Sequence, residues 1–339
     1  MYSIYQFFRL IRFANIVVII LTMAVFYGFL SNFQFTRQYL LLNESQEFLS
    51  YTPTLMTKLG FGDSTFVLLM LSVLLIAASG NIINDYFDVK ADRINKPNRL
   101  IIDKYIKRRW AIFLNWTFNG IGVLISLYLS WKLSNIWIFI IAFASINLLY
   151  FYSAVYKRKF LSGNMIVALL TSIVPFYVFI YAAFSDFNAA SPFGNQDDIF
   201  IWETLVVIGT YCLFAFLINF IREIVKDMAD VKGDLKLQSK TIPIRFGFRR
   251  TKTMLLFLYL LAFIPIAFFI GAGSQIGPLS PQTLLGGKVF TLLLVAVVIC
   301  MLFSYTFLIL KNRRKNYLMA SNALKFALLF GVISALFYA

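Results

Sequence analysis

Residues 81–99 read NIINDYFDVKADRINKPNR and follow directly on the apolar run 64–79. Asn84, Asp88 and Asp92 are spaced four residues apart, so a helix places them on one face, a turn apart. Like charges at this spacing repel each other, which argues against a solvated stripe. A hard cation such as Mg²⁺ removes that repulsion and prefers carboxylate oxygen together with phosphate. Cations that suit an anion arriving with the metal follow at Arg93, Lys96 and Arg99.

A second polar burst, residues 222–234, reads REIVKDMADVKGD and closes the apolar run 200–220. Asp227, Asp230 and Asp234 again fall on one helical face. Together the two bursts hold seven of the 15 acidic residues of a chain whose net charge is +16. Two acidic clusters ringed by Lys and Arg are what a Mg²⁺-diphosphate site requires, so we expect the two helix ends to face each other.

The composition predicts an integral membrane protein. The chain has 339 residues, of which 60% are hydrophobic and 14% are charged. Soluble domains carry about a quarter charged residues, and the apolar residues here form long unbroken blocks. The absence of histidine excludes His-ligated zinc or haem and His general-base chemistry. Cys212 and Cys300 each lie inside an apolar block, so we expect packing residues rather than a disulfide or metal pair.

Apolar segments of about 20 residues, the length that crosses a bilayer, divide the chain into spans. We expect nine spans, at 15–30, 64–84, 110–131, 135–156, 164–185, 200–221, 253–272, 288–310 and 317–338. Residues 1–13 are expected to form a short interfacial helix, and 31–63 a polar, aromatic loop. No small-residue cleavage site follows the first span, which favours an uncleaved helix over a signal peptide. The predicted fold class is therefore all-α, a polytopic membrane bundle.

The distribution of basic residues predicts the orientation of these spans. With the N-terminus in the cytoplasm, 26 of the 31 Lys and Arg fall on the cytoplasmic side. The basic excess is then orientation charge and attraction to anionic lipid, which argues against a nucleic-acid partner. Both acidic bursts lie at the cytoplasmic ends of the second and sixth spans, which share a direction. We expect two similar four-helix halves plus one helix, in a single membrane domain over residues 1–339.

An allylic diphosphate is a substrate that suits such a protein. Its diphosphate head needs Mg²⁺ and cations, and its hydrocarbon tail prefers to lie between membrane helices. Bound metals would stabilise the charge that develops on the departing diphosphate. Aromatic faces would shelter the allylic cation, and the chain holds 38 Phe, 18 Tyr and 5 Trp. The expected partners are this diphosphate, a hydrophobic acceptor and the lipid bilayer.

The motifs of the chain resemble those of the UbiA-type intramembrane prenyltransferases. The family's first motif, NDxxDxxxD, matches residues 84–92, and its second, DxxxD, matches 230–234, with Asp227 one turn before. A third element, Tyr-Ser followed shortly by Lys-Arg after the fourth helix, matches residues 152–153 and 157–158. The nine-helix layout also matches, so the resemblance covers nearly the whole chain.

The resemblance implies a role for each matching residue. One Mg²⁺ and its diphosphate oxygens would be held by Asn84, Asp88 and Asp92, and the other by Asp227, Asp230 and Asp234. Tyr152 would contact the diphosphate or the allylic cation. The residues implied to carry catalysis are Asp88, Asp92, Asp230, Asp234 and Tyr152. Arg93, Lys96, Arg99 and Lys157 would contact diphosphate or an acceptor anion, and Asp85 would lie behind the metal ligands. The full set of side chains implied to bind substrate is Asn84, Asp85, Arg93, Lys96, Arg99, Lys157 and Lys226.

The sequence leaves the acceptor open. The run 92–99 looks like a D-x-I-N-K-P form found in members that act on glycerol-phosphate ethers, homogentisate and chlorophyllide. The run 222–234 looks most like the digeranylgeranylglyceryl phosphate synthases, which transfer a geranylgeranyl group to the free hydroxyl of geranylgeranylglyceryl phosphate. One departure is Arg99-Leu100, where many members have Arg-Pro. Prenylation of an aromatic acceptor in quinone biosynthesis therefore stays an alternative.

Plainer explanations compete with these assignments. Single Asp or Asn residues at helix ends are often caps, but both bursts and the third motif together favour a site. The cluster KNRRK at 311–315 is expected to be lipid-facing charge. A transporter or channel would place ionisable groups near the bilayer midplane, where Lys325 is the main candidate and no acid lies deep in a span. We expect Lys325 to snorkel or to lie beside a polar partner.

Overall fold

The computed structural model describes residues 2–41, 59–95, 100–184, 198–236, 238–271, 284–310 and 312–338. The α-helices are α1 (Tyr2–Leu10), α2 (Phe13–Leu41), α4 (Ser64–Asn95), α5 (Arg108–Lys132), α6 (Ile136–Ala154), α7 (Ser162–Phe184), α8 (Asp198–Lys236), α9 (Ile242–Gly271), α10 (Leu284–Ile309) and α11 (Arg314–Ser334). Two 3₁₀ turns are η3 (Tyr156–Arg158) and η5 (Ala335–Phe337). The described ranges contain no strand, only an isolated bridge between Ile102 and Ile106. The predicted all-α fold is confirmed.

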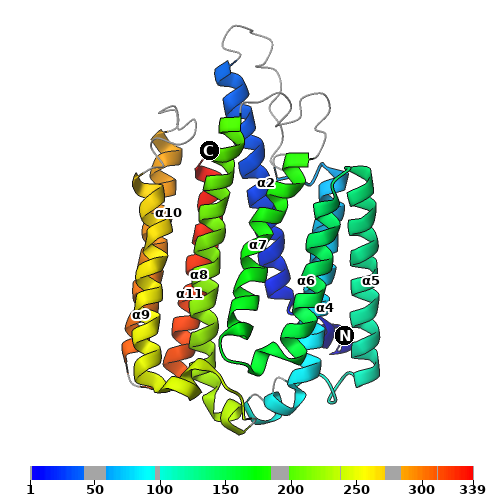
Figure 1. Ribbon diagram of the computed structural model, residues 1–339, viewed down its shortest axis with the longest axis vertical. Coiled ribbons are helices and arrows are strands. Elements are labelled where there is room, and N and C mark those ends of the chain that lie inside the picture. Colours follow the sequence, from blue (N-terminus) through cyan, green and yellow to red (C-terminus); the bar gives the residue numbers. More distant parts are fainter. Residues whose placement is uncertain are drawn as a thin grey trace.

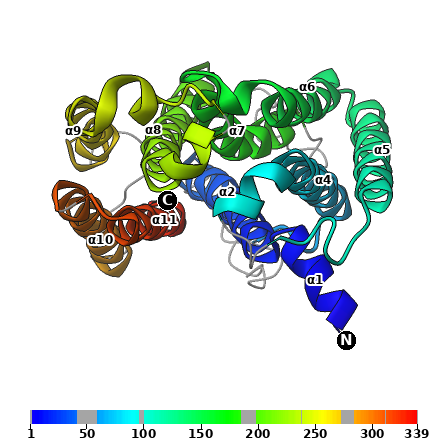
Figure 2. The same cartoon turned by 90° about the horizontal axis from the view of Figure 1, so that it is seen from below.

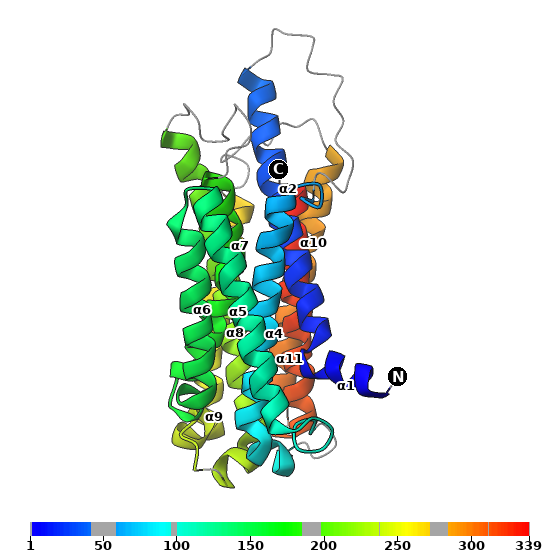
Figure 3. The same cartoon turned by 90° about the vertical axis from the view of Figure 1, so that its right-hand side faces the viewer.

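Nine of the helices in the described ranges are long and apolar enough to cross a membrane. They run side by side along the long axis of the molecule (Figure 1). Each overlaps one of the nine predicted spans, so the predicted count and positions are confirmed. The remaining helix, α1, is short and lies at an angle to the others near one end of the bundle (Figure 3). Arg12, with a φ of 53°, separates it from α2.

The helices form two groups of four with α2 between them, as Figure 2 shows. One group is α4–α7 and the other is α8–α11. Helix α2 contacts α4 and α7 of the first group and α11 of the second. Apolar side chains from α2, α4, α7 and α8 make one core, and side chains from α8 to α11 make another. Helices α7 and α8 also pack against each other and join the two groups, and the similarity of the two predicted four-helix halves stays a prediction.

The predicted loop 31–63 is wrong at its start, because α2 continues to Leu41. Residues 31–41 read SNFQFTRQYLL and contain neither glycine nor proline, so no residue there interrupts the helix. Their polarity marks the end of the apolar segment rather than the end of the helix. Residues 42–58 lie outside the described residues. Helix α4 then begins behind Asp63, whose Oδ1 accepts the backbone N–H of Thr65 at 2.9 Å.

Helices α4 and α8 are longer than a membrane crossing requires. They have 32 and 39 residues, which at about 1.5 Å per residue exceeds a hydrocarbon core of about 30 Å. Their polar ends lie at the same end of the bundle, the lower end in Figure 1. These ends carry the two acidic bursts as continuous helix, so the spacing that predicts one-face clusters is present in both.

Candidate functional site

The polar ends of α4 and α8 lie at the same end of the molecule, and the two helices contact each other. Tyr152, near the end of α6, lies within electrostatic range of Asp88 on α4 and of Glu223 and Asp227 on α8. The predicted meeting of the two helix ends is therefore confirmed. We call this region the acidic rim: residues 84–92 of α4, residues 222–234 of α8 and the turn η3.

Lys157, in η3, binds the first acidic burst. Its Nζ donates a hydrogen bond to Asn84 Oδ1 at 2.9 Å and also pairs with the Asp88 carboxylate. Burial opposes the charge of Lys157, but the Asp88 carboxylate outweighs that effect and raises the pKa of Lys157 above its ordinary value. The same Nζ lies 5.9 Å from the centroid of the Tyr152 ring, a cation–π distance. Lys157 thus links the ends of α4 and α6.

The residues after η3 reach the second acidic burst. Gly163, at the start of α7, packs closely on the turn, since a Cβ there would lie 2.9 Å from the carbonyl oxygen of Tyr156. The next residue, Asn164, donates from Nδ2 to Asp227 Oδ2 at 2.8 Å. The connection between α6 and α7 therefore contacts α4 through Lys157 and α8 through Asn164. These contacts fix the position of the first acidic burst relative to the second.

Arg12 connects the N-terminal helix to the acidic rim. Its Nη2 lies 2.6 Å from Asp85 Oδ1, and Asn81 Nδ2 donates to the carbonyl oxygen of Ile11 at 3.0 Å. Desolvation opposes the charge of Arg12, whose side chain is 43% exposed, but the carboxylates of Asp85 and Asp88 outweigh it and raise the pKa of Arg12. In the sequence, Arg12 looks like an ordinary cation of an interfacial helix. Its pairing with Asp85 is not visible there, because the two residues are 73 positions apart. Sequence reasoning therefore missed it.

Asp230, in the second burst, pairs with a cation from α11. Arg314 Nη2 lies 3.2 Å from Asp230 Oδ1. The prediction that residues 311–315 are lipid-facing charge is thus wrong for Arg314, because α11 packs against α8 and brings this residue to the acidic rim. Asp92 and Asp234 are half-buried on α4 and α8, at the positions that the motif spacing predicts.

Three residues of α8 form an ion cluster just before the second acidic face. Glu223 Oε1 accepts from Arg222 Nη1 at 3.2 Å and pairs with the ammonium of Lys226. Lys226, a predicted substrate contact, therefore lies beside the acids with Glu223 as its partner. Sequence reasoning assigned no role to Arg222 or Glu223, because neither belongs to the aspartate motifs.

Of the three cations that follow the first burst, the structure describes only Arg93. Its Nη2 lies 3.2 Å from Asp103 Oδ2 in the connection between α4 and α5, and Arg108 Nη2 lies 2.9 Å from the same oxygen. Lys96 and Arg99 lie outside the described residues. A contact of these three cations with substrate stays a prediction.

The oxygens of the acidic rim suit a hard cation, although protein cations hold them in this structure. Across the described ranges, no three Asp, Glu, His or Cys side chains converge closely enough to bind one metal ion. Asp85, Asp88 and Asp230 each pair with an Arg or Lys. The ammonium of Lys157 stands in for a cation between an amide oxygen and a carboxylate. These are the donors that Mg²⁺ prefers, so the residues fit this ion once Lys157 moves aside.

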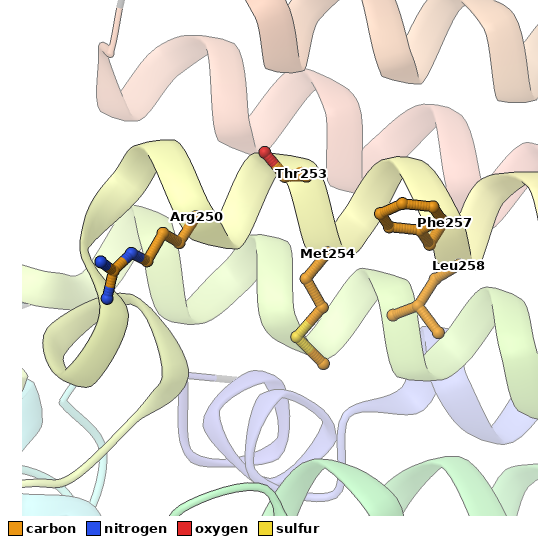
Figure 4. A pocket seen from close by; sticks show the side chains of 5 residues that line it. All are labelled: Arg250, Thr253, Met254, Phe257 and Leu258. Carbon is orange, nitrogen blue, oxygen red and sulfur yellow. The ribbon is translucent and has the colours of Figure 1, made fainter.

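A separate open groove, of about 450 Å³, runs along α9. Its five lining side chains come from this one helix, with Arg250 at one end and Phe257 and Leu258 at the other (Figure 4). None of the predicted site residues lines it. It is a groove on one helix with a mainly apolar lining, and it brings no carboxylates or amides together.

The chain matches the model of the UbiA prenyltransferase family over residues 52–329. A digeranylgeranylglyceryl phosphate synthase from Sulfurisphaera tokodaii is 35% identical over 206 residues, which cover 60% of this chain and 66% of that protein. The protein of the same name from Thermococcus kodakarensis is 32% identical over 213 residues, 62% of this chain and 68% of that protein. The matched region thus spans about two thirds of the length of these curated relatives.

Solved structures share the fold. One of a digeranylgeranylglyceryl phosphate synthase in membranes has a TM-score of 0.61 at 24% identity and covers 99% of both chains. A UbiA homologue from Archaeoglobus fulgidus, bound to DMAPP and Mg²⁺, has a TM-score of 0.53 at 18% identity and covers 97% of this chain and 99% of that one. At these identities the likeness shows the fold alone.

Proposed function

The chain belongs to the UbiA prenyltransferase family, and we propose that it transfers a geranylgeranyl group from an allylic diphosphate to the free hydroxyl of geranylgeranylglyceryl phosphate. The hydroxyl oxygen bonds to the first carbon of the prenyl chain, the bond from that carbon to diphosphate breaks, and the hydroxyl proton is lost. The observation that carries the proposal is the meeting of the two carboxylate-bearing helix ends, with Lys157 bound to Asn84 and Asp88. The names of the relatives support this choice of acceptor.

Mg²⁺ is the metal that we assign to the acidic rim. A UbiA homologue from Archaeoglobus fulgidus binds DMAPP or GPP together with Mg²⁺, which supports this choice. The residues that would hold two ions are Asn84, Asp88 and Asp92 on α4 and Asp227, Asp230 and Asp234 on α8. When bound, the ions would withdraw electrons from the diphosphate and stabilise the charge it gains on departure.

Lys157 has a different partner before and after substrate binds. Before binding, its ammonium neutralises Asp88 and occupies Asn84 Oδ1, which keeps half-buried acids compensated. With these oxygens holding a metal ion, the ammonium would be free to donate to the diphosphate. Tyr152 already lies at cation–π distance from that ammonium. Its ring can then stabilise positive charge on the allylic carbon instead.

We place the acidic rim on the cytoplasmic side of a multi-pass membrane protein. Two observations support a protein that crosses the membrane several times: the nine apolar helices of the described ranges and membership of the UbiA family. The side follows from the basic residues, 26 of 31 of which fall on the cytoplasmic side in this orientation. The charged heads of both substrates then meet at the rim, while their hydrocarbon chains lie among the helices.

Asp88→Asn and Asp230→Asn in purified protein test the proposed function. Each change keeps the shape of the side chain and removes one charge from one helix end. We expect both variants to lose transfer while they keep the helix content and elution volume of the wild type. Undiminished turnover in both would remove the proposed function.

A competition between acceptors tests the second half of the proposal. Radiolabelled geranylgeranyl diphosphate is supplied with geranylgeranylglyceryl phosphate in one reaction and with a phenolic acid in the other. We expect labelled product from the glycerol phosphate ether. If only the phenolic acid is prenylated, the aromatic acceptor replaces the ether lipid as the substrate.

A further inference from the structure

Arg222 is a buried cation that the roles above leave unused. Its side chain is 14% exposed, and its Nη1 donates to Glu223 Oε1 at 3.2 Å. Its Nε is also buried, and no hydrogen-bond partner for this atom exists among the described residues. Leaving a buried donor of a charged group unpaired is costly, so such an atom calls for an explanation. An acceptor supplied by a ligand is the simplest one.

The residues around Arg222 carry more positive than negative charge. Glu223 is shared by Arg222 and Lys226, so one carboxylate compensates two cations. Arg12 lies within electrostatic range of both cations, although its own guanidinium is paired with Asp85. The Lys226 side chain is 36% exposed, so a ligand can reach the cluster. An anion at this position would balance the cation that Glu223 leaves uncompensated. It would also offset the repulsion from Arg12.

Helix geometry places Arg222 deeper in the bundle than the metal-binding acids. Arg222 and Lys226 are four residues apart and share one face of α8. The same four-residue step continues from Lys226 to Asp230 and Asp234, while Glu223 and Asp227 lie on the adjacent face. Arg222 precedes Asp227 by five residues, which places it about 7.5 Å deeper along α8, toward the apolar part of the bundle. Arg222 therefore lies inward of the acids, where the first carbon of a prenyl chain would lie, and Lys226 lies level with Asp227.

We propose that Arg222 and Lys226 hold the phosphate of the acceptor, a phosphomonoester, without a metal ion. This inference rests on the proposed function and assigns acceptor recognition within the same site. A guanidinium matches phosphate oxygens with two parallel donors, and Arg222 Nε is one such donor. In the acceptor, the free hydroxyl lies on the carbon next to the one that carries the phosphate. Anchoring the phosphate inward of the acids brings that hydroxyl to the reacting prenyl carbon.

Two other anions are less well matched to this cluster. In the proposed function the allylic diphosphate would bind through metal ions at the acids and through Lys157, which lies beside Asn84 and Asp88. A carboxylate of a phenolic acceptor carries one negative charge, which balances only the cation that Glu223 leaves uncompensated, whereas a phosphomonoester carries close to two and also offsets the repulsion from Arg12. The structure therefore favours the phosphorylated lipid, and the other two anions become outcomes of the test.

Equilibrium binding in EDTA tests the site without metal or turnover. Purified protein is titrated with radiolabelled geranylgeranylglyceryl phosphate and with the same lipid lacking its phosphate. We expect the wild type to bind the phosphorylated lipid at least about tenfold more tightly, and Arg222→Gln to bind the two lipids alike. Arg222→Lys keeps the charge but not the paired donors, so it should retain part of the preference. Arg249→Gln, at an exposed cation of α9, is the matched control and should bind as the wild type does.

Kinetics distinguish this site from the diphosphate site. We expect Arg222→Gln to raise the KM for the phosphorylated acceptor about 30-fold and to leave the KM for the allylic diphosphate unchanged. A raised KM for the diphosphate, tighter binding of a phenolic acid than of the phosphorylated lipid, or equal binding of the two lipids by the wild type would overturn the proposal. If Arg222→Gln does not fold, Arg222→Lys carries the same comparison. Binding through Arg222 without any product would refute the proposed transfer and leave the anion site standing.

Discussion

The two acidic bursts look alike in sequence, but they differ in the origin of their counter-charges. On α4, Asp85 and Asp88 pair with cations of other elements, Arg12 and Lys157. On α8, Arg222 and Lys226 belong to the helix itself, where Glu223 is their partner. The two ends are therefore not equivalent halves of one metal clamp.

This difference separates two kinds of electrostatic behaviour. A cation from another element can move away when a metal ion arrives, because only a turn or a side chain has to shift. For a cation on the same helix, the distance between its Cα and the Cα atoms of the acids stays fixed, whatever ligand binds. The α4 end thus suits the exchange of a protein cation for Mg²⁺, whereas the α8 end offers acids for metal beside a permanent positive face.

The largest loss of transfer is expected from removing a metal-binding carboxylate, a role that the ends of α4 and α8 share. Asp88→Asn and Asp230→Asn should each lower transfer by roughly 10³-fold or more, because each removes a carboxylate that would hold a metal ion. Product formation and the binding of Mn²⁺, followed by electron paramagnetic resonance, measure the two consequences. A loss confined to Asp88→Asn would show that the α8 end does not bind metal.

The second prediction concerns the exchange of Lys157 for metal. Lys157→Met should lower transfer by about 10²-fold, because the diphosphate loses a charged donor. The same variant should bind Mn²⁺ about tenfold more tightly when no diphosphate is present, since the competing ammonium is gone. Lys159→Met, at the exposed neighbour in the same connection, should change neither quantity. Weaker Mn²⁺ binding in Lys157→Met would mean that the lysine supports the metal site rather than competing with it.

The third prediction concerns the other external cation of α4. Arg12→Gln should lower transfer about tenfold, because Asp85 loses its partner and α1 loses an attachment to the rim. The double variant with Asp85→Asn should lose little more than either single variant, since both remove the same interaction. Arg9→Gln, at a cation of α1 that bonds to Gln6, is the control. Additive losses would show that Arg12 and Asp85 act separately.

Features that depend on neighbours in the chain could be predicted from the sequence. The nine spans follow from the length of apolar runs, and the one-face acids follow from their spacing. The end of α2 could not be predicted in the same way, because polarity changes at residue 31 while the helix continues to Leu41. The polarity of a segment indicates whether it lies in lipid or in water, but it does not show where the helix ends.

Contacts between distant elements could not be predicted. Arg12 meets Asp85 across 73 residues and Arg314 meets Asp230 across 84. Both depend on how helices pack, and each cation alone resembles an orientation charge of a membrane loop. The unpaired Nε of Arg222 is invisible in the sequence for the same reason, since burial and missing partners are properties of the packed bundle.

The smallest effect is expected at Arg314, a cation of α11 that pairs with Asp230 at the α8 end. The side chains of Arg314 and Asp230 are 48% and 21% exposed, and pairs this accessible contribute at most about 1 kcal/mol. Arg314→Gln should therefore lower transfer by about threefold or less, and Arg313→Gln, at its exposed neighbour, should leave it unchanged. Initial rates at saturating substrates, measured side by side with Lys157→Met, make the comparison. A loss in Arg314→Gln as large as that in Lys157→Met would show that the α8 end also depends on a cation from another element, and the contrast between the two ends would disappear.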